Sequence, residues 1–252
     1  MDFTGKVAFI TGAGGFIGAD NARKLASLGA KVVVSDIRQE NIDRVAEEIR
    51  AAGGEATAIQ ADVTQSASVD AAVAKTVELY GRLDIMIHVA GGSARARTKP
   101  LVEQSDEVIE WVLNVNLLGA FWACRAAARQ MLKQGQGGKI LCYSSIIGFM
   151  GGGCFSDYAA AKGGISSMVK ALAKEWGPQQ INVNAIAPGI VMRPEETGGD
   201  ARALNTNVFH RKCEVSDVSN LAAFLVSDEA SFVTGQTYII DGGRSLSLKG
   251  SD

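Results

Sequence analysis

The stretch ITGAGGFIG, residues 10–18, stands near the N-terminus between an apolar run of strand character and a segment of helical character. Glycine has no side chain, so the backbone can turn sharply there and approach a ligand closely. A helix that begins just after such a turn offers free N–H groups and a partial positive charge to an anion. The order of strand, glycine turn and helix therefore predicts a binding site for the pyrophosphate of a dinucleotide. The glycines of the turn are Gly12, Gly14, Gly15 and Gly18.

A carboxylate at the end of the next apolar run supports this interpretation. The run KVVVSD, residues 31–36, ends in Asp36, at close to the spacing of about 20 residues that dinucleotide sites show between glycine turn and acid. A carboxylate there accepts hydrogen bonds from the adenosine ribose hydroxyls and repels a 2′-phosphate. Residues 13–16 include no basic residue that could bind such a phosphate, although Arg38 lies nearby. The sequence therefore favours NAD over NADP.

Buried strands and amphipathic helices alternate along the rest of the chain. We expect strands at residues 6–11, 31–36, 56–62, 83–91, 139–145, 181–189 and 235–243, and helices from the glycine turn to residue 28 and at residues 41–52, 66–80, 111–132, 158–176 and 215–226. Such alternation packs helices on both faces of a parallel sheet. The prediction is an α/β fold, one domain over residues 1–252 with a Rossmann-type doubly wound parallel sheet. Residues 192–215 lack clear periodicity and are expected to form a lid over the substrate.

Composition excludes several other classes of protein. A formal net charge of −2 gives no general attraction to nucleic acid or to anionic membranes. No apolar run approaches the roughly 18 residues of a membrane span, and residues 1–12 do not read as a signal peptide. The four cysteines and two histidines do not stand at metal-binding spacings. We expect a cytoplasmic protein that holds no metal and has neither a nucleic-acid nor a membrane partner.

Three polar side chains in the second half of the chain form a candidate catalytic group. Ser145 ends an expected strand, and Tyr158 and Lys162 stand four apart, so both project from one face of the helix that follows. A phenol normally titrates near about 10, too high for an efficient base at neutral pH. We expect the Lys162 ammonium and the positive ring of an oxidised nicotinamide to lower the pKa of Tyr158. The Ser145 hydroxyl would then hold the substrate oxygen.

Motifs along the whole chain resemble those of the short-chain dehydrogenase/reductase family. They are TGAGGFIG (residues 11–18), Asp36, ADV (61–63), AG (90–91), NVNLLG (114–119), YSS (143–145), YAAAK (158–162), INVNAIAPG (181–189) and TGQTYIIDGG (234–243). The resemblance implies that Asn116 completes a catalytic tetrad with Ser145, Tyr158 and Lys162, and that its backbone holds a water in a proton relay. It further implies that Asp62 and Val63 contact adenine and that the backbone of residues 188–191 contacts the nicotinamide amide. The full set of expected cofactor contacts is Gly12, Gly14, Gly15, Phe16, Ile17, Gly18, Asp36, Asp62, Val63, Val89, Ala90, Gly91, Tyr158, Lys162, Pro188, Gly189 and Val191.

The chain departs from the family pattern at three places. Phe16 occupies the middle glycine of the TGxxxGxG pattern of short members, so the loop matches the TGxxGxxG spacing of the extended branch, which includes sugar epimerases and dehydratases. The length and the C-terminal motif nevertheless resemble the short branch. His88 and Val89 replace two asparagine amides that usually steady the central sheet. Arg193 stands where a threonine is common, which weakens the transfer of cofactor contacts in the lid.

Several cations follow expected strand ends, where ligands bind in this class of fold. Arg95 and Arg97 follow the strand at residues 83–91, and Arg193 lies in the expected lid. Arginine grips carboxylates and phosphates through two parallel hydrogen bonds. These three residues are candidate ligands for an anionic substrate, although solvated loop charges would show the same pattern.

The reaction that these features predict is NAD-dependent interconversion of a secondary alcohol and a ketone, with Tyr158 as acid or base. The alternatives are an epimerase or dehydratase that retains NAD, an oxoacyl-thioester reductase, and an NAD-binding protein that is not an enzyme. The resemblance also implies a homotetramer, paired through the expected helices at residues 114–132 and 158–176. The small residues of the second helix would permit close helix packing.

Overall fold

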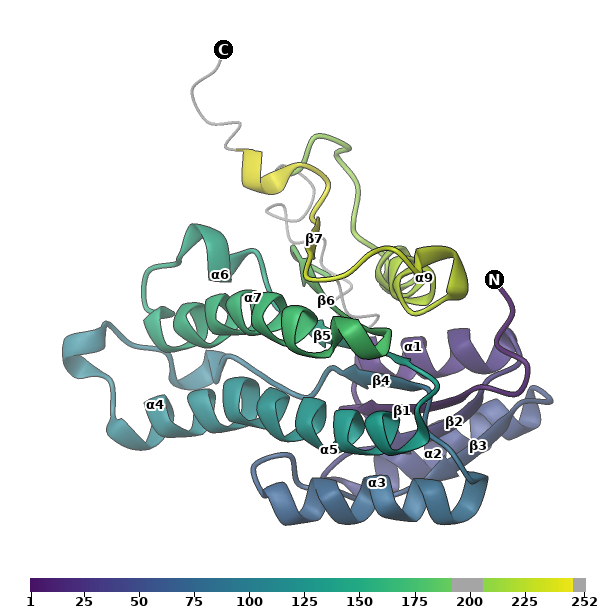
Figure 1. Ribbon diagram of the computed structural model, residues 1–252. Coiled ribbons are helices and arrows are strands. Elements are labelled where there is room, and N and C mark those ends of the chain that lie inside the picture. The colour runs from purple at the N-terminus through teal and green to yellow at the C-terminus, as the bar shows by residue number, and fades with distance from the viewer. Residues whose placement is uncertain (192–205, 247–252) are drawn as a thin grey trace.

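The computed structural model describes residues 1–191 and 206–246, and these form one α/β domain built on a seven-stranded sheet (Figure 1). All neighbouring strands are parallel, in the order β3-β2-β1-β4-β5-β6-β7. The strands are β1 (Val7–Thr11), β2 (Lys31–Ser35), β3 (Glu55–Ala58), β4 (Ile85–His88), β5 (Gly138–Tyr143), β6 (Ile181–Pro188) and β7 (Thr237–Ile240). The doubly wound parallel sheet predicted from the sequence is confirmed.

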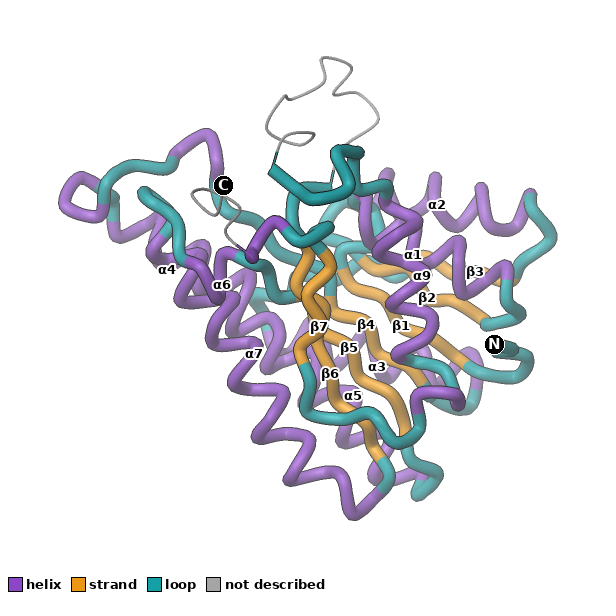
Figure 2. Tube along the Cα trace, turned by 90° about the horizontal axis from the view of Figure 1, so that it is seen from above, coloured by secondary structure: helices purple, strands orange, loops and turns teal. Residues whose placement is uncertain are grey.

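Helices cover both faces of the sheet, as Figure 2 shows from above. On one face lie α1 (Phe16–Ser27), α2 (Gln39–Ala51) and α9 (Val215–Leu225). On the other lie α3 (Ser66–Tyr80), α5 (Gly119–Gln134) and α7 (Ser156–Trp176). Two more helices, α4 (Asp106–Leu113) and α6 (Ile147–Met150), extend from the edge where the strands end. No helix in residues 1–191 or 206–246 is long and apolar enough to cross a membrane.

The hydrophobic core has two halves, one on each face of the sheet. Ile10 and Val34 pack with the side chains of α1, α2 and α9, whereas Phe9 and Val33 pack with those of α3, α5 and α7. Because successive strand side chains point to opposite faces, a strand covered on both sides must be apolar throughout. This explains why the central strands read as unbroken apolar runs.

Several boundaries differ from the sequence-based expectation. The strand expected at residues 56–62 ends at Ala58. Beyond it, Ile59 N bonds to Val34 O of β2 (3.0 Å) and Ala61 N bonds to Asp36 O just after β2 (3.1 Å). The strand expected at residues 83–91 is confined to β4. The helix expected at residues 111–132 begins at Asp106 and is interrupted by a π-helical turn, η3 (Asn114–Leu118). Apolar residues continue beyond the residues that are hydrogen-bonded into the sheet. Periodicity alone therefore predicted strands that are too long.

Candidate active site

The glycine turn after β1 is packed so tightly that side chains cannot replace most of its glycines. Gly12 has a φ of +65°, and a Cβ there would lie 2.6 Å from the Ala90 backbone nitrogen. A Cβ on Gly14 would lie 2.7 Å from the Cβ of Asn41 and 3.1 Å from Cγ of Asp36. Gly18, in the first turn of α1, packs directly against the Gly12 carbonyl. The turn therefore lies against the loop after β4 on one side and the end of β2 on the other.

The N-terminus of α1 is suited to an anion. Gly15 caps the helix without a side-chain hydrogen bond, and the first turn holds no acidic residue. The N–H groups of this turn have no partner within the helix and point outward along its axis. Phe16 is the first residue of the helix and is half-buried, so the aromatic side chain is accommodated at the position where short family members carry glycine.

Asp36 lies beside this turn, and the Asp62–Val63 pair follows β3, the strand next to β2. Oδ1 of Asp36 accepts a hydrogen bond from the backbone N–H of Arg38 at 3.2 Å, while Arg38 itself is exposed. Oδ1 of Asp62 accepts bonds from Thr64 N (2.9 Å) and Thr64 Oγ1 (2.7 Å). Val63 is buried against Gly119. Asp36 directly follows β2, as the sequence predicted, whereas Asp62 lies four residues beyond the end of β3.

The three candidate catalytic side chains come together at the ends of β5 and the start of α7. Ser145 follows β5, and its hydroxyl lies close enough to the Tyr158 phenol to favour the phenolate. Lys162, one turn after Tyr158 and 4% exposed, places Nζ 5.6 Å from the centroid of the Tyr158 ring. Its Nζ donates a hydrogen bond to the Tyr143 carbonyl oxygen at 2.7 Å. The spacing argument for these residues thus agrees with the structure.

Asn116 lies in the π turn η3 and joins this group through the loop after β4. A bond from Gly119 N to Asn114 O spans five residues and marks the widened turn. The Asn116 side chain donates to Gly92 O (2.8 Å) and Val112 O (2.8 Å) and accepts from Gly92 N (3.1 Å). π turns occur often at functional sites. Periodicity gave no signal for this one, because the helical pattern of apolar residues continues through it.

Gly91 is where Asn116 and Lys162 meet. A Cβ on Gly91 would clash with Oδ1 of Asn116 and lie 3.4 Å from Nζ of Lys162. The clamp between Asn116 and Gly92 therefore holds the loop of Val89, Ala90 and Gly91 against Lys162. The same loop packs against Gly12, so the glycine turn and the catalytic group are joined.

Burial dominates the titration of both catalytic groups. It raises the pKa of Tyr158, while the Ser145 hydrogen bond and the Arg95 charge act in the opposite direction. It lowers the pKa of Lys162 to about 8. The expected lowering depends on Lys162 together with an oxidised nicotinamide ring. In the protein chain by itself, desolvation of the phenolate outweighs the contributions of Ser145 and Arg95, and the pKa of Tyr158 is raised. At pH 7 Lys162 is still mostly charged. The hydrogen bond from its Nζ to the Tyr143 carbonyl oxygen offsets part of the cost of burying that charge.

The end of β6 approaches the same group from the other side. The Ile146 N–H donates to Pro188 O at 3.2 Å, and the Gly189 N–H donates to Ile240 O at 3.0 Å. Val191 then forms an isolated parallel bridge with Cys213. This bridge closes the base of the segment expected to form the lid, of which residues 192–205, including Arg193, lie outside the described residues.

The candidate substrate cations differ in their partners. Arg97 pairs with Glu107 at 3.0 Å. The Arg95 guanidinium makes no hydrogen bond or ion pair with the described residues, and its charge acts on Tyr158. Both belong to a short helix, η1 (Arg95–Arg97). The preceding Ala94 has a φ of +49°, a backbone conformation that disfavours side chains larger than glycine.

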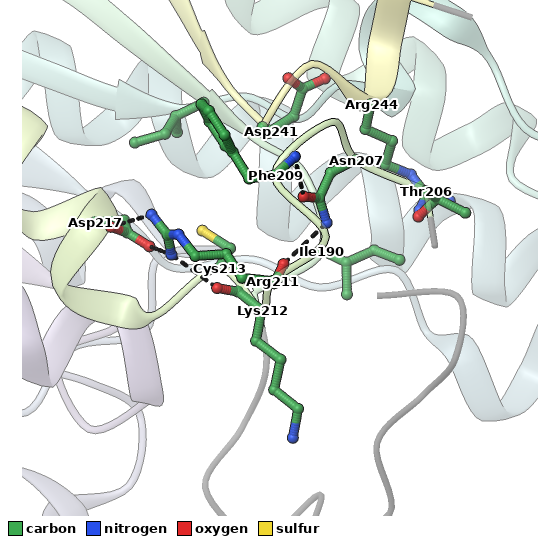
Figure 3. A pocket seen from close by; sticks show the side chains of 12 residues that line it. Ile190, Thr206, Asn207, Phe209, Arg211, Lys212, Cys213, Asp217, Asp241 and Arg244 are labelled. Carbon is green, nitrogen blue, oxygen red and sulfur yellow. Dashed lines mark hydrogen bonds and ion pairs between the residues drawn. The ribbon is translucent and has the colours of Figure 1, made fainter. Parts of the chain in front are cut away.

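A cavity of about 240 Å³ lies where β6 and β7 end, next to the base of the expected lid (Figure 3). Arg211 crosses one side and pairs with Asp217 at 2.6 Å, and Asn207 donates to Arg211 O at 2.9 Å. The other lining residues include Ile190, Phe209, Lys212, Cys213, Ile240, Asp241 and Arg244. The sequence identified the cations of this segment but gave no sign of a hollow, which depends on how the segment folds back on β7.

A family model described as enoyl-(acyl carrier protein) reductase matches residues 12–245. A 3-oxoacyl-[acyl-carrier-protein] reductase from Thermotoga maritima is 37% identical over 247 residues, covering 96% of this chain and 99% of the relative. A trans-4-hydroxycyclohexanecarboxylate dehydrogenase from Sinomonas cyclohexanicum is 38% identical over 248 residues, covering 95% and 93%.

A solved structure has nearly the same fold. A short-chain type dehydrogenase/reductase from Mycobacterium ulcerans superposes with a TM-score of 0.92 at 29% sequence identity, covering 98% of this chain and 92% of the other. The likeness therefore extends through the whole sheet, the glycine turn and the catalytic helix.

Proposed function

The chain belongs to the short-chain dehydrogenase/reductase family of oxidoreductases, and on this premise we propose that it interconverts a secondary alcohol and a ketone with NAD. One observation carries the proposal. The Ser145 hydroxyl lies close enough to the Tyr158 phenol to act against the raised pKa of that phenol, while Lys162 lies 5.6 Å from the ring of the same tyrosine. A hydroxyl to orient the substrate, a proton-transferring phenol and a cation at that distance are the groups that alcohol oxidation requires.

The roles follow from the positions of these side chains. Tyr158 takes the hydroxyl proton of the alcohol, or returns it to the ketone, and Ser145 holds the substrate oxygen beside it. Lys162, fixed by Tyr143 O, places a positive charge near the phenolate that forms. The nicotinamide would accept or supply the hydride. The positive ring of its oxidised form would add the charge that offsets the burial of Tyr158.

The residues around the glycine turn fit a dinucleotide. A Cβ at Gly12 or Gly14 would close the cradle, and the start of α1 offers unpaired N–H groups. Asp36 lies beside Gly14 with its carboxylate half-buried, which suits ribose hydroxyls and opposes a 2′-phosphate. These features support NAD rather than NADP. Tighter binding of NADP would contradict the assignment and would implicate the exposed Arg38.

The substrate is proposed to carry an anionic group that Arg95 binds, beneath a lid at about residues 192–215. Gly92, three residues before Arg95, is clamped by Asn116, so the arginine extends from a fixed point beside the active site. Arg97 is engaged by Glu107 and is the weaker candidate. The Sinomonas relative is named for a hydroxy acid, which agrees with a carboxylate at this position. Arg193 would add a second cation from the lid.

Two alternative reactions have specific support. The Thermotoga relative is named as an oxoacyl reductase, which favours reduction of an oxoacyl thioester. The TGxxGxxG spacing of the glycine turn favours an epimerase or dehydratase that retains NAD. We also propose a homotetramer in the cytoplasm. Exposed apolar side chains on α4 and α5 support the assembly, and free cysteines agree with a reducing compartment.

The decisive experiment offers the purified protein a panel of secondary alcohols, hydroxy acids and oxoacyl thioesters with NAD or NADP. A dehydrogenase accumulates NADH, read by its absorbance, in proportion to the ketone formed. An epimerase or dehydratase converts its substrate with no net NADH. A thioester reductase is fastest in the reverse direction and with a thioester. Absence of any hydride transfer across the panel would contradict the proposal.

A further inference from the structure

Tyr143, the last residue of β5, has hydrogen-bonding groups that reach two different parts of the molecule. Its carbonyl oxygen accepts the bond from Nζ of Lys162, a residue of α7, at 2.7 Å. Its side chain is 4% exposed and packs on the other face of the sheet, in the half of the core that includes α1. The residue that holds the Lys162 ammonium therefore also reaches the helix that begins at the glycine turn.

The peptide between Tyr143 and Ser144 offers its carbonyl to Lys162 because no neighbouring strand uses it. The Ser144 N–H donates to Ile186 O of β6 at 2.8 Å. In a trans peptide the carbonyl points away from the N–H, so Tyr143 O faces β4, the other neighbour of β5. The pairing of β4 with β5 ends one residue earlier, at Cys142, and the oxygen is left for a side chain.

The phenol of Tyr143 is held by Asn21, which lies in the middle of α1 and is 1% exposed. Nδ2 of Asn21 donates to Tyr143 Oη at 2.9 Å and to Ile17 O at 2.8 Å. Tyr143 Oη in turn lies 3.1 Å from Asn21 Oδ1 and donates to it. Burial raises the pKa of the Tyr143 phenol, so the hydroxyl keeps its proton at neutral pH. The two side chains satisfy each other in apolar surroundings.

Packing alone does not require such a pair. Two apolar side chains of the same shape would stabilise the contact between α1 and the sheet about as well. A hydrogen bond adds direction, because it fixes the phenol and with it the backbone of Tyr143. Ser144 holds the other end of the same lysine, since its Oγ donates to Lys162 O at 2.8 Å. The peptide at residues 143–144 therefore contacts Lys162 at both its side chain and its main chain.

We propose that Asn21 is a positioning residue that, through the Tyr143 phenol, fixes the carbonyl that holds the Lys162 ammonium beside Tyr158. The contacts run from Ile17 O in the first turn of α1, through Asn21 and Tyr143, to Nζ of Lys162. That turn is where the pyrophosphate is proposed to bind, so the pair joins the cofactor helix to the ammonium. A carbonyl oxygen at hydrogen-bond distance stabilises the charged form of an amine. The effect on turnover rests on the proposed function.

Three variants of the full chain separate positioning from packing. Tyr143→Phe removes only the hydroxyl, Asn21→Leu keeps a side chain of similar shape, and the third variant combines both changes. Each single variant leaves one buried polar group without its partner, so its Tm should fall by about 2–8 °C. The double variant replaces both partners by apolar groups, and its Tm should return to within about 2 °C of the wild type.

The kinetics should not recover together with the stability. We expect kcat for alcohol oxidation to fall about tenfold in all three variants, within the roughly 10²-fold that a misplacement of about 1 Å costs, while KM for NAD stays within about threefold. The pKa that Lys162 contributes to the pH–rate profile should fall by about one unit, because the charged form loses an acceptor. A double variant that regains both Tm and kcat would show that the pair only packs, and would overturn the inference. Full kcat in Tyr143→Phe would overturn it as well.

Ser219→Ala is the matched control on the same helix. Ser219 is 2% exposed, and its Oγ donates to Oδ2 of Asp20, the neighbour of Asn21 in α1, at 2.6 Å. The variant therefore also removes a hydrogen bond that holds α1, but one that does not lead to Lys162. Its Tm should fall in the same range, while kcat and the pH–rate profile stay unchanged. An equal fall of kcat in Ser219→Ala would show that any loosening of α1 has this effect, and would overturn the inference.

The titration of Lys162 can also be measured without turnover. The folded protein releases the Lys162 proton near pH 8 and the unfolded chain near 10.5, so stability rises with pH between these values. In urea unfolding this rise should begin about one unit lower in the double variant than in the wild type. The titratable groups that act on or lie beside Lys162 are His88 of β4, Cys142 of β5 and Tyr158 of α7, and Asp20 acts on the Tyr143 phenol; the variants retain all four.

The two measurements distinguish this inference from the proposed function. A rise of stability that begins at the same pH in the double variant and the wild type would overturn the positioning role of Asn21. A shifted rise in a protein that forms no NADH with any alcohol would instead contradict the proposed function and support the positioning role.

Discussion

Lys162 shows most directly that active-site chemistry opposes stability at the level of a single residue. Its ammonium is buried in α7 with one backbone acceptor, and its pKa is lowered to about 8 from 10.5. Each unit of pKa corresponds to about 1.4 kcal/mol, so retaining the buried charge at pH 7 costs about 3 kcal/mol. The folded protein releases this proton near pH 8 and the unfolded chain near 10.5. Between these values the unfolded state binds more protons, and stability therefore rises with pH.

Lys162→Met removes the buried charge and tests this account. The variant should be inactive, yet more stable than the wild type at pH 7, by about 3 kcal/mol less the lost hydrogen bond. Its advantage should shrink as pH rises from about 8 toward 10, because the wild type then loses the same charge. Urea unfolding at several pH values measures this. Lys170→Met, on the exposed face of the same helix, is the control and should show no such trend. A stability difference that is constant with pH would contradict the account.

Arg95 and Arg97 offer a matched comparison within one short helix. Arg95→Ala should lower kcat/KM for an acidic alcohol about 10- to 100-fold, the loss expected for one charge-assisted hydrogen bond, and should leave its neutral amide nearly unchanged. Arg97→Ala should change both substrates less than about twofold, because an exposed pair such as Arg97–Glu107 contributes little. If kcat/KM for the acid is no higher than for the amide, or is unchanged by Arg95→Ala, an anionic substrate bound by Arg95 is excluded.

Spacing along the sequence was sufficient to predict which of these side chains lie together. Tyr158 and Lys162 share one face because a helix aligns positions four apart, and Asp36 lies beside the glycine turn because it follows the neighbouring strand. The sequence could not reveal that burial governs the pKa of Tyr158, because burial depends on packing between α7 and the loop after β4. It also could not reveal the hydrogen bond between Thr11 Oγ1 and His88 Nδ1, which joins residues 77 apart in the sequence.

Among the elements, the glycine turn with α1 is the most constrained. Gly18 lies on the face of α1 that packs against the Gly12 carbonyl, so the helix can begin here only without a side chain at that position. The η3 turn is the opposite case. Apolar residues keep helical spacing through residues 111–132, and so a single helix was expected where a π turn divides α4 from α5. A π turn is defined by which carbonyl each backbone N–H bonds to. It therefore cannot be recognised from the spacing of apolar residues.

Gly18→Ala is the prediction that belongs to this element. The added methyl must push the start of α1 away from the glycine turn, so we expect a loss of about 1–3 kcal/mol of stability and a marked loss of NAD affinity. Thermal unfolding and fluorescence titration with NAD measure the two effects. Gly153→Ala is the control, because the φ of Gly153 is not in the left-handed region and nothing lies within 4 Å of the new Cβ. If the two variants lose stability and NAD affinity to the same extent, tight packing at Gly18 does not explain either loss.

For the whole molecule, the order of strands determines where the site lies. The chain moves outward from β1 to β3, then returns to β4 and moves the other way, so the loops after β1 and β4 diverge and leave a crevice where ligands bind in such sheets. This topology follows from alternating strands and helices and was predictable. The cavity between the ends of β6 and β7 was not, because it depends on how an irregular segment folds back.

Assembly is tested at the same scale. Trp111, Leu118, Phe121 and Leu132 lie exposed along α4, η3 and α5, where burial against a second copy would be favourable. Light scattering at micromolar concentration should give four times the chain mass, and Phe121→Glu should lower it while leaving the fold intact by circular dichroism. A monomeric wild type would contradict the proposed tetramer.

The central claim is that Tyr158 transfers the proton during hydride transfer to NAD. The most direct measurement is NADH formation by Tyr158→Phe on the best alcohol of the panel, beside NAD binding by the same variant. The phenylalanine ring preserves packing and removes only the hydroxyl. The account predicts a fall in kcat of about 10²–10⁴-fold with NAD affinity within about twofold of the wild type. Near-full turnover by Tyr158→Phe would contradict it.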